Sequence, residues 1–331
     1  MKKFVLLAAV LFASVTFSYA QFQFTSIDYL GGFGTRTRGI NNHGQIVGSY
    51  DTEDGNRHAL LIQKGKFIPL APDTILGTDY SDAYKINDRG DVVGWDCDDV
   101  TCHAFLLRDG VVTLLDFPGA TLTYGWDINE SGAVAGVWDL YDSQGNFIYE
   151  GGFLWKDGSF TEVAFPGAGD TAVTGINARG DFVGLWDSGP PDYTNTSFIF
   201  SKGEFTSFDL PFPDLTNVQP SGINAQGNII GQWYENGLPR GFLKVGEAFT
   251  NVDYPGAAYS SAWGINAAGW MVGNWYESSG TVHGWLAQPV KNGMSALSPS
   301  TLGKANGSSH KMRPAPGSKV PIPARAQRMS R

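Results

Sequence analysis

The stretch GINARGDFVGLWD, residues 175–187, is one of six related stretches in the chain. Each has Gly-Ile-Asn or a close variant, two free positions, a glycine, and a short apolar run that ends in glycine shortly before an aromatic residue. The asparagines are 46, 42, 48, 47 and 42 residues apart, a period typical of a four-stranded propeller blade. They are Asn41, Asn87, Asn129, Asn177, Asn224 and Asn266.

Each copy predicts a tight hairpin. Asn, two free residues and Gly are the pattern of a type I turn, in which the Asn side chain caps the turn and Gly takes the left-handed position. The run Phe182-Val183 is β-branched or aromatic, as a sheet buried on both faces requires. Gly184, which closes this run, is expected to let another backbone or a large ring approach closely.

The two ends of the repeat region decide how the strands close. A third strand follows in each period, such as HAFLL from His103, and a Gly-bearing turn leads to a fourth, which gives 24 strands. The sixth period stops after its third strand, HGWLAQPV, whereas FQFTSIDYLGG precedes the first Gly-Ile-Asn as an unpaired fourth strand. We therefore predict an all-β fold over residues 21–290: a six-bladed β-propeller with four strands per blade, closed by the N-terminal strand completing the last blade.

These residues resemble the extracellular repeats of the HAF family, which combine Gly-Ile-Asn, Gly after two residues, Val-Gly and then His-Ala-Phe-Leu. The resemblance covers all six periods. The His is present at His58, His103 and His283, while Gly152, Ser197 and Gly241 replace it or its neighbour in the other periods. The resemblance implies an exported repeat protein of bacteria and implies no reaction, substrate or catalytic residue.

The two termini differ from the repeat region. Residues 1–20 combine Lys2 and Lys3, an apolar stretch and Ser18-Tyr19-Ala20, which predicts a signal peptide and an extracellular or periplasmic location. No later stretch is apolar for long enough to predict a membrane span. Residues 291–331 contain eight basic residues and no acid, and their Pro, Ser and Lys content predicts a disordered tail.

The charge of the repeat region excludes one class of partner. Residues 21–290 hold 13 basic and 32 acidic residues, a net charge of −19, which argues against nucleic acid. Cys97 and Cys102 are five residues apart, and we predict a disulfide between them. The alternative, a metal site with His103 and a neighbouring Asp, lacks a second ligand cluster.

We expect ligands to bind at the face that collects the second-to-third loops and the crossings between blades, because these loops are the long ones. One candidate set precedes the Gly-Ile-Asn stretches and should surround the mouth of the central channel: Arg38, Tyr84, Trp126, Thr174, Ser221 and Trp263. The residue type varies within this set, as a site for an asymmetric ligand requires.

A second candidate set follows the glycine that ends each second strand. Aromatic rings beside carboxylates suit sugars, because C–H faces stack on Trp and hydroxyls bond to Asp. The alternative is that one Trp per blade packs between neighbouring sheets. The set comprises Tyr50-Asp51, Trp95-Asp96, Trp138-Asp139, Trp186-Asp187, Trp233-Tyr234 and Trp275-Tyr276.

Enzyme chemistry has weaker support. His58, His103 and His283 belong to third strands of different blades, too far apart to share one metal ion, and we expect them to cap turns. No nucleophile elbow for a Ser-His-Asp triad occurs. Paired carboxylates remain a possibility, because a glycosidase needs only two at about 5 to 9 Å. The acids that can converge are Asp51, Asp96, Asp139, Asp170, Asp187 and Asp214.

We therefore expect a monomeric binding or surface-interaction module without a cofactor, whose partner is a carbohydrate or a cell-envelope protein. Calcium binding by the acidic loops at 51–56 and 96–101 stays open, although neither has EF-hand spacing. Two further roles stay open for the whole protein. One is a polysaccharide-acting hydrolase or lyase that uses Asp pairs on the long-loop face, and the second is a purely structural cell-envelope protein.

Overall fold

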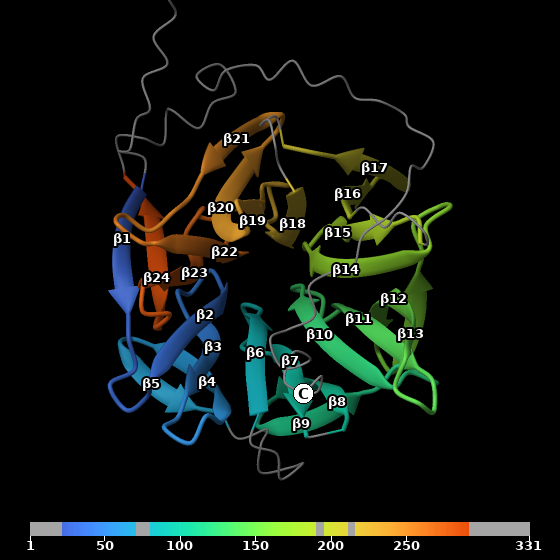
Figure 1. Cartoon of the computed structure of the whole chain (residues 1–331), viewed down its shortest axis with the longest axis horizontal. Coiled ribbons are helices and arrows are strands. Elements are labelled where there is room, and N and C mark those ends of the chain that lie inside the picture. Colours follow the sequence, from blue (N-terminus) through green and yellow to red (C-terminus); the bar gives the residue numbers. More distant parts are fainter. Residues whose placement is uncertain (1–21, 71–79, 99, 190–194, 211–215, 291–331) are drawn as a thin grey trace, which may run out of the picture.

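The computed structural model describes residues 22–70, 80–98, 100–189, 195–210 and 216–290. These residues form 24 strands and no helix, and the strands are arranged as six antiparallel blades around a central axis (Figure 1). The predicted signal peptide and basic tail, like Asp214, lie outside the described residues. No helix among the described residues is long and apolar enough to cross a membrane.

Each blade has four strands, which follow one another from the axis outward. Blade 1 contains β2 (Gly34–Ile40), β3 (Ile46–Asp51), β4 (Arg57–Gln63) and β5 (Lys66–Pro69). Blade 2 contains β6 (Tyr80–Ile86), β7 (Val92–Cys97), β8 (Cys102–Arg108) and β9 (Val111–Leu115). Blade 3 contains β10 (Leu122–Ile128), β11 (Val134–Tyr141), β12 (Phe147–Lys156) and β13 (Ser159–Val163). Blade 4 contains β14 (Asp170–Ile176), β15 (Phe182–Asp187), β16 (Thr196–Ser201) and β17 (Glu204–Phe208). Blade 5 contains β18 (Thr216–Ile223), β19 (Ile229–Glu235), β20 (Leu238–Val245) and β21 (Ala248–Asn251). Blade 6 contains β22 (Tyr259–Ile265), β23 (Met271–Tyr276), β24 (Val282–Pro289) and β1 (Phe22–Ile27).

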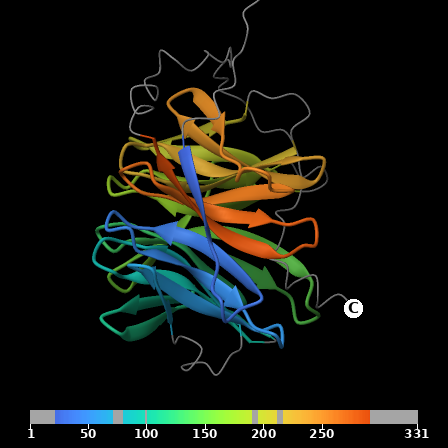
Figure 2. The ribbon, with the colours of Figure 1, turned by 90° about the vertical axis from the view of Figure 1, so that its left-hand side faces the viewer.

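The predicted closure is confirmed. Strand β1 pairs antiparallel with β24, from Phe22 opposite Pro289 to Ile27 opposite Gly284, and so supplies the outer strand of blade 6 (Figure 2). The first and last strands of the described region thus share one blade, and no blade is left short of a strand.

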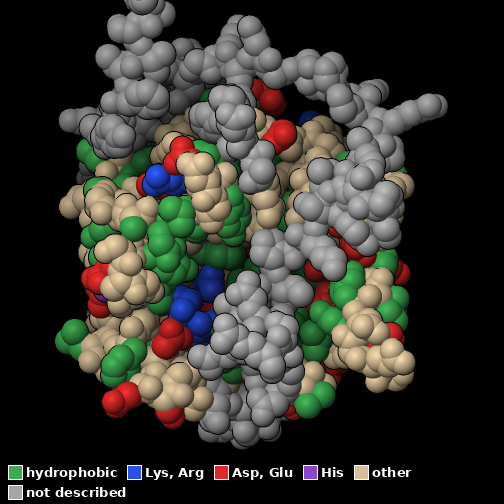
Figure 3. Space-filling view, in the orientation of Figure 1, with side chains coloured by type: hydrophobic (Ala, Val, Ile, Leu, Met, Phe, Trp, Pro, Cys, Tyr) green, Lys and Arg blue, Asp and Glu red, His purple; other side chains and the backbone are tan. Residues whose placement is uncertain are grey.

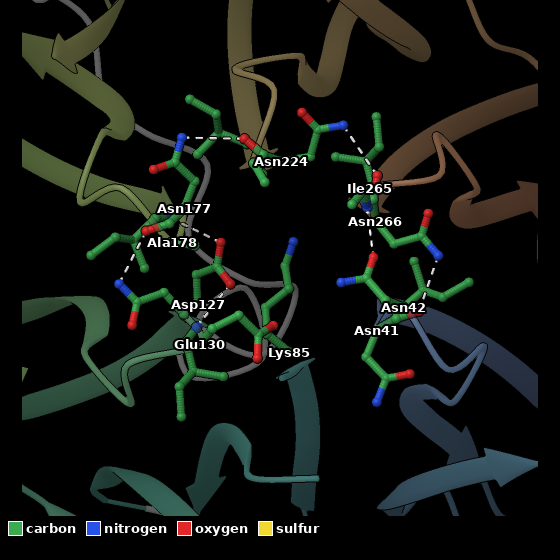
Figure 4. A pocket seen from close by; sticks show the side chains of 18 of the residues that line it. Asn41, Asn42, Lys85, Asp127, Glu130, Asn177, Ala178, Asn224, Ile265 and Asn266 are labelled. Carbon is green, nitrogen blue, oxygen red and sulfur yellow. Dashed lines mark hydrogen bonds between the residues drawn. The ribbon is translucent and has the colours of Figure 1, made fainter. Parts of the chain in front are cut away.

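The repeated asparagines join neighbouring blades. In every hairpin the Asn side-chain oxygen accepts hydrogen bonds from the backbone N–H groups two and four residues later, as at Asn177 from Arg179 (2.9 Å) and Asp181 (3.1 Å). The side-chain nitrogen of the same residue donates to the backbone oxygen of the corresponding Asn in the next blade, at 3.0–3.2 Å in all six cases. Figure 4 shows some of these bonds, such as the one from Asn177 to Asn224. Since the sixth of these bonds runs from Asn266 back to Asn41, the asparagines form a closed ring. We call it the asparagine ring.

Replacing Asn224 with alanine is expected to lower the free energy of unfolding by about 3 kcal/mol, because one buried and two partly buried hydrogen bonds are lost at ~1 kcal/mol each. The three partners are the N–H groups of Gln226 and Asn228 and the carbonyl of Asn266. Urea denaturation measures the change. Gln226→Ala, an exposed side chain in the same hairpin, is the control and should cost less than about 0.5 kcal/mol. Equal losses in the two variants would contradict a structural role for the ring.

In every blade a glycine of the second strand lies against the backbone of the first strand, and in five of the six blades it also lies against an aromatic ring. The glycine does not end the strand as the sequence predicted, since β15 continues from Gly184 to Asp187. A Cβ at Gly184 would overlap the carbonyl oxygen of Ala172 in the first strand and lie 2.9 Å from the Phe198 ring. The first strand has a β-bulge at this point, between Val173 and Gly175. The same overlap with a first-strand carbonyl recurs in the other five blades, at Gly48, Gly94, Gly136, Gly231 and Gly273.

Most of the core lies at the boundaries between neighbouring blades. The third strand of each blade contributes one fully buried large side chain, and five of the six are aromatic. The six residues are Leu60, Phe105, Phe153, Phe198, Phe242 and Trp285.

The cysteines and the repeated histidines of the third strands both have partners in the structure. The predicted disulfide is present between Cys97 and Cys102, which are directly paired residues of β7 and β8.

The expectation that the repeated histidines cap turns is wrong for two of them. The Nδ1 atoms of His103 and His283 lie 2.8 and 2.6 Å from carboxylates just beyond the outer strands of their blades, those of Asp116 and Asp28 respectively.

Candidate functional site

A cavity of about 390 Å³ opens on the long-loop face, at the end of the central channel. We call it the main cavity. Apolar and charged side chains meet in the hollow at the middle of this face (Figure 3). All six blades contribute to the lining. The lining residues are Arg36, Arg38, Arg57, Tyr84, Trp95, Tyr124, Trp126, Val137, Asp139, Glu150, Ala172, Thr174, Leu185, Gln219, Pro220, Ser221, Gln232, Tyr234, Pro239, Ser261, Trp263 and Tyr276.

The first candidate set converges on the main cavity, since all six of its residues line it. They lie deeper than we expected. The inner strands begin before these residues, as β2 does at Gly34 ahead of Arg38, so the set lies well inside the channel instead of around its mouth. Thr174 and Ser221 use their hydroxyls to bond the next blade, at the carbonyls of Pro220 (2.7 Å) and Ala262 (2.8 Å). Aromatic and arginine side chains are left to face a ligand.

Aromatic rings form much of the inner end of the main cavity, which we call its floor. Trp126 and Trp263 stack with ring centroids 6.4 Å apart and planes inclined at 23°, and Tyr84 lies edge-on to both. The indole nitrogen of Trp263 donates to Ser261 Oγ at 2.9 Å. The indole nitrogen of Trp126 is buried and has no hydrogen-bond partner among the described residues, so its N–H is a donor that the protein leaves unsatisfied.

Three arginines line the main cavity from blade 1, and each already has a carboxylate partner. Arg36 and Arg57 both contact Asp51, at 2.6 and 2.9 Å. Arg38 contacts buried Asp82 at 3.3 Å, and its guanidinium lies over the rings of Tyr84 (4.9 Å) and Trp263 (4.3 Å). This packing fixes the Arg38 side chain in the floor of the cavity.

Two carboxylates line the main cavity from blade 3, and we call them the acid wall. Asp139 of β11 and Glu150 of β12 are directly opposite each other in the sheet. Burial, and secondarily the charge of Asp170, raises the pKa of Asp139 to about 7. Burial and the charge of Asp139 raise the pKa of Glu150 well above its usual value. Asp139 is only 5% exposed, and its Oδ1 has no hydrogen-bond partner among the described residues.

Most residues of the second candidate set, those that follow the second-strand glycines, do not line the main cavity. Trp138, Trp186 and Trp275 stack on aromatic residues of the segments that enter their blades, with ring centroids 4.6, 4.5 and 4.9 Å apart. Trp233 is buried in the hydrophobic cluster between blades 4 and 5. None of the four lines the main cavity, and neither do Asp96 and Asp187, both of which are buried.

Trp95 does line the cavity, because it is one position out of step with the other tryptophans. It directly follows Gly94, whereas Trp138 stands two residues after Gly136. Since successive side chains of a strand point to opposite faces, Trp95 takes the position of Val137, and both line the main cavity. Trp95 is 2% exposed and packs against Tyr80, Tyr84 and Tyr124.

Several lining residues were missed in the sequence. Arg36 and Tyr124 stand two residues before Arg38 and Trp126, on the same strands and therefore on the same face. This spacing was the available signal. Glu150 had no such signal, because it reaches the cavity through its pairing with Asp139, which depends on the length of the preceding loop.

The Lys85 side chain crosses the central channel below the floor of the main cavity. Lys85 and Asp127 occupy the position that is Gly in the other four blades, and Lys85 Nζ reaches across to the carbonyls of Ser221 (2.9 Å) and Trp263 (2.7 Å). Burial raises the pKa of Asp127 to about 6, with nearby Lys85 opposing the shift. Beyond this crossing lies a second cavity of about 90 Å³, lined by five of the six asparagines of the ring, all but Asn87 (Figure 4). The two cavities share no lining residue.

Within the described ranges, no group of three or more His, Cys, Asp or Glu side chains is arranged to hold a metal ion. Calcium binding therefore stays a prediction from the sequence.

Comparison with known proteins concerns the fold. No protein-family model matches the chain, and no curated protein matches its sequence. A protein of unknown function from Dyadobacter fermentans is similar in structure, with a TM-score of 0.51, 9% identity, and coverage of 82% of this chain and 100% of that chain. The six-bladed fungal lectin of Aleuria aurantia gives a TM-score of 0.47 at 10% identity over 82% of this chain and 92% of that chain. The β-propeller domain of the trilobed protease from Pyrococcus furiosus gives 0.46 at 10% identity over 77% and 94%.

Proposed function

We propose that this protein is an exported HAF-type repeat protein that binds carbohydrate in the main cavity. The observation that carries the proposal is the composition of that cavity. Stacked Trp126 and Trp263 provide flat apolar surfaces, and two buried atoms of cavity-lining residues, the donor Trp126 Nε1 and the acceptor Asp139 Oδ1, are satisfied by no described residue. A sugar ring presents this combination, C–H faces beside hydroxyl groups that both donate and accept.

The geometry also suits an asymmetric ligand better than a repeated one. The six blades present different residues to the main cavity, with arginines on blade 1 and carboxylates on blade 3. One ligand per propeller is therefore expected, in contrast to one ligand per blade. Titration calorimetry of the purified protein with a bound glycan gives the stoichiometry directly.

The first test is a panel of soluble glycans and insoluble polysaccharides. Binding of at least one glycan, at a stoichiometry near one, supports the proposal. If no glycan on the panel binds, the proposal fails, and the partner is then to be sought among cell-envelope proteins.

A second candidate function, hydrolysis of a polysaccharide, is favoured by the acid wall. A retaining or inverting glycosidase needs one carboxyl that is protonated near neutral pH and a second carboxylate nearby. Asp139 has a raised pKa, and Glu150 is its direct neighbour across the sheet. If the protein is an enzyme, incubation with a bound glycan releases reducing ends, and Asp139→Asn removes turnover while binding persists. If the protein only binds, no reducing ends appear at any pH between 5 and 8.

A further inference from the structure

The acid wall belongs to a larger group of carboxylates at the boundary between blades 3 and 4. Asp139 is paired across the sheet with Glu150, and Asp170 is paired in the same way with Asp187. The two pairs are adjacent, because the backbone N–H of Glu150 donates to Asp170 Oδ1 at 2.9 Å. The group therefore places four acids within two neighbouring blades.

No cation compensates these acids within the part of the chain that the structure describes. The hydrogen bonds that they accept come from neutral backbone groups, from Glu150 to Asp170 and from Gly189 to Asp187 at 2.6 Å. Asp139 is buried, and its Oδ1 accepts no hydrogen bond from any described residue. Buried carboxylates without a partner are unfavourable, so a cation that reaches them is bound favourably.

The two sides of the main cavity differ in whether their charged side chains are paired with opposite charges. Arg36, Arg38 and Arg57 on blade 1 are already paired with Asp51 or Asp82. Asp139 and Glu150 face the same cavity unpaired. The three arginines share two carboxylates, so blade 1 carries one excess positive charge, whereas any charge on the acid wall of blade 3 is negative and has no cationic partner among the described residues. A cationic group of a ligand is therefore directed to the blade 3 side of the cavity, beside the ring of Tyr124, which also favours a cation.

We propose that the main cavity selects an amino sugar with a free amine, whose ammonium group is held by Asp139 and Glu150 while its ring packs on the aromatic floor. This inference rests on the proposed function and narrows its ligand class. An ammonium suits the acid wall because it is compact and carries three N–H donors, enough for both carboxylates and one further acceptor. An N-acetyl group at the same place offers one N–H and no charge.

The charge states of both partners give the binding a pH dependence. Burial and neighbouring acids keep the pKa of Asp139 near 7, so this carboxyl is largely neutral at pH 5.5. The other titratable groups around it are Tyr124 of β10, Tyr141 of β11, Glu150 of β12, Asp170 of β14 and Asp187 of β15. An ammonium favours the ionised acids, so where the ligand amine is protonated and the acids are largely neutral, binding releases protons and affinity rises from pH 5.5 to 6.5. The rise ends at roughly pH 7 to 8, where the sugar amine, like an α-amino group, loses its own proton.

The test compares β-1,4-linked glucosamine oligomers with N-acetylated oligomers of the same length. Titration calorimetry at pH 5.5 and 6.5, in two buffers of different ionisation enthalpy, measures affinity and proton release together. At pH 6.5 the glucosamine oligomer is expected to bind at least about tenfold more tightly than the acetylated oligomer, the factor expected for a charge-assisted hydrogen bond. Proton release is expected with the glucosamine oligomer and not with the acetylated one.

Variants assign the preference to the acid wall. Asp139→Asn and Glu150→Gln should abolish the preference for the free amine, measured as the ratio of the dissociation constants of the acetylated and the glucosamine oligomers. Asp187→Asn is the matched control, because Asp187 belongs to the same carboxylate group but does not line the cavity, and it should keep the preference. Thermal melts verify that each variant is folded.

The outcomes separate this inference from the proposed function. Tighter binding of the acetylated oligomer, equal binding of both, or a preference that survives Asp139→Asn overturns the inference and leaves carbohydrate binding intact. If neither these oligomers nor any other glycan binds, both proposals fail. Tight binding of simple alkylamines that equals binding of the glucosamine oligomer also overturns it, since the sugar ring then contributes nothing.

Discussion

Replacing Trp263 with alanine is expected to weaken glycan binding by about 30-fold, which corresponds to ~2 kcal/mol for an aromatic residue at the centre of a binding site. Trp263 stacks with Trp126 and lies over the Arg38 guanidinium, so its removal takes away one apolar surface and loosens the side chain beside it. Titration calorimetry with a glycan identified on the panel measures the loss.

Trp186→Ala is the matched control for this prediction, because Trp186 is buried against Phe165 and does not line the main cavity. It should lower the free energy of unfolding by about 3 to 5 kcal/mol, as expected for a large buried aromatic. Binding measured well below its melting temperature should stay within twofold of wild type. If Trp263→Ala binds normally, or if Trp186→Ala loses binding while folded, the site does not lie where we place it.

Replacing Gly184 with alanine is expected to lower the free energy of unfolding by about 3 kcal/mol or more, the upper end of the range for overpacked interiors. The new methyl group would overlap the carbonyl oxygen of Ala172 and approach the Phe198 ring. A backbone oxygen within a sheet cannot rotate away as a side chain does. The two strands must separate at the bulge, and their hydrogen bonds weaken. Urea denaturation followed by tryptophan fluorescence measures the effect.

The control is Gly158→Ala, in the turn between β12 and β13. Gly158 has φ 85°, and nothing lies within 4 Å of the position of an added Cβ. Alanine there is strained by its backbone conformation alone, which costs about 1 kcal/mol. The comparison separates the two reasons for a glycine, since Gly184 is required for space and Gly158 for conformation. Similar losses in both variants would contradict the close approach seen at Gly184.

Much of the fold was predictable because its signals are local and repeated. The Asn–Gly hairpins, the glycine before the aromatic residue, and the fourth strand at Phe22–Ile27 without a neighbour each have a short-range physical reason. The asparagine ring was not predicted. Capping of a turn by Asn follows from the sequence, whereas the bond from its nitrogen to the next blade depends on how closely the blades approach.

The site was predictable only in part, because local and repeated signals can be read from the sequence whereas contacts between blades cannot. The residues before the Gly-Ile-Asn stretches converge because they occupy equivalent places on six inner strands. Trp95 and Trp138 look alike in the sequence, yet one position separates them relative to the preceding glycine, and they lie on opposite faces. The unpartnered state of Asp139 could not be predicted, because it depends on the arrangement of charges across two blades.

The pairing of β1 with β24 also determines the order in which the chain is able to complete its fold. Strand β1 is synthesised before any blade exists, and its partner, more than 250 residues later, is synthesised after all the others. Blades 1 to 5 consist of consecutive strands and are able to form as synthesis proceeds, while the last blade waits for both chain ends. Such long-range pairing is intrinsically slow. The ring thus closes only after the last blade has been made, which suits the export that we propose, because an exported chain is able to cross a membrane unfolded and fold on the far side.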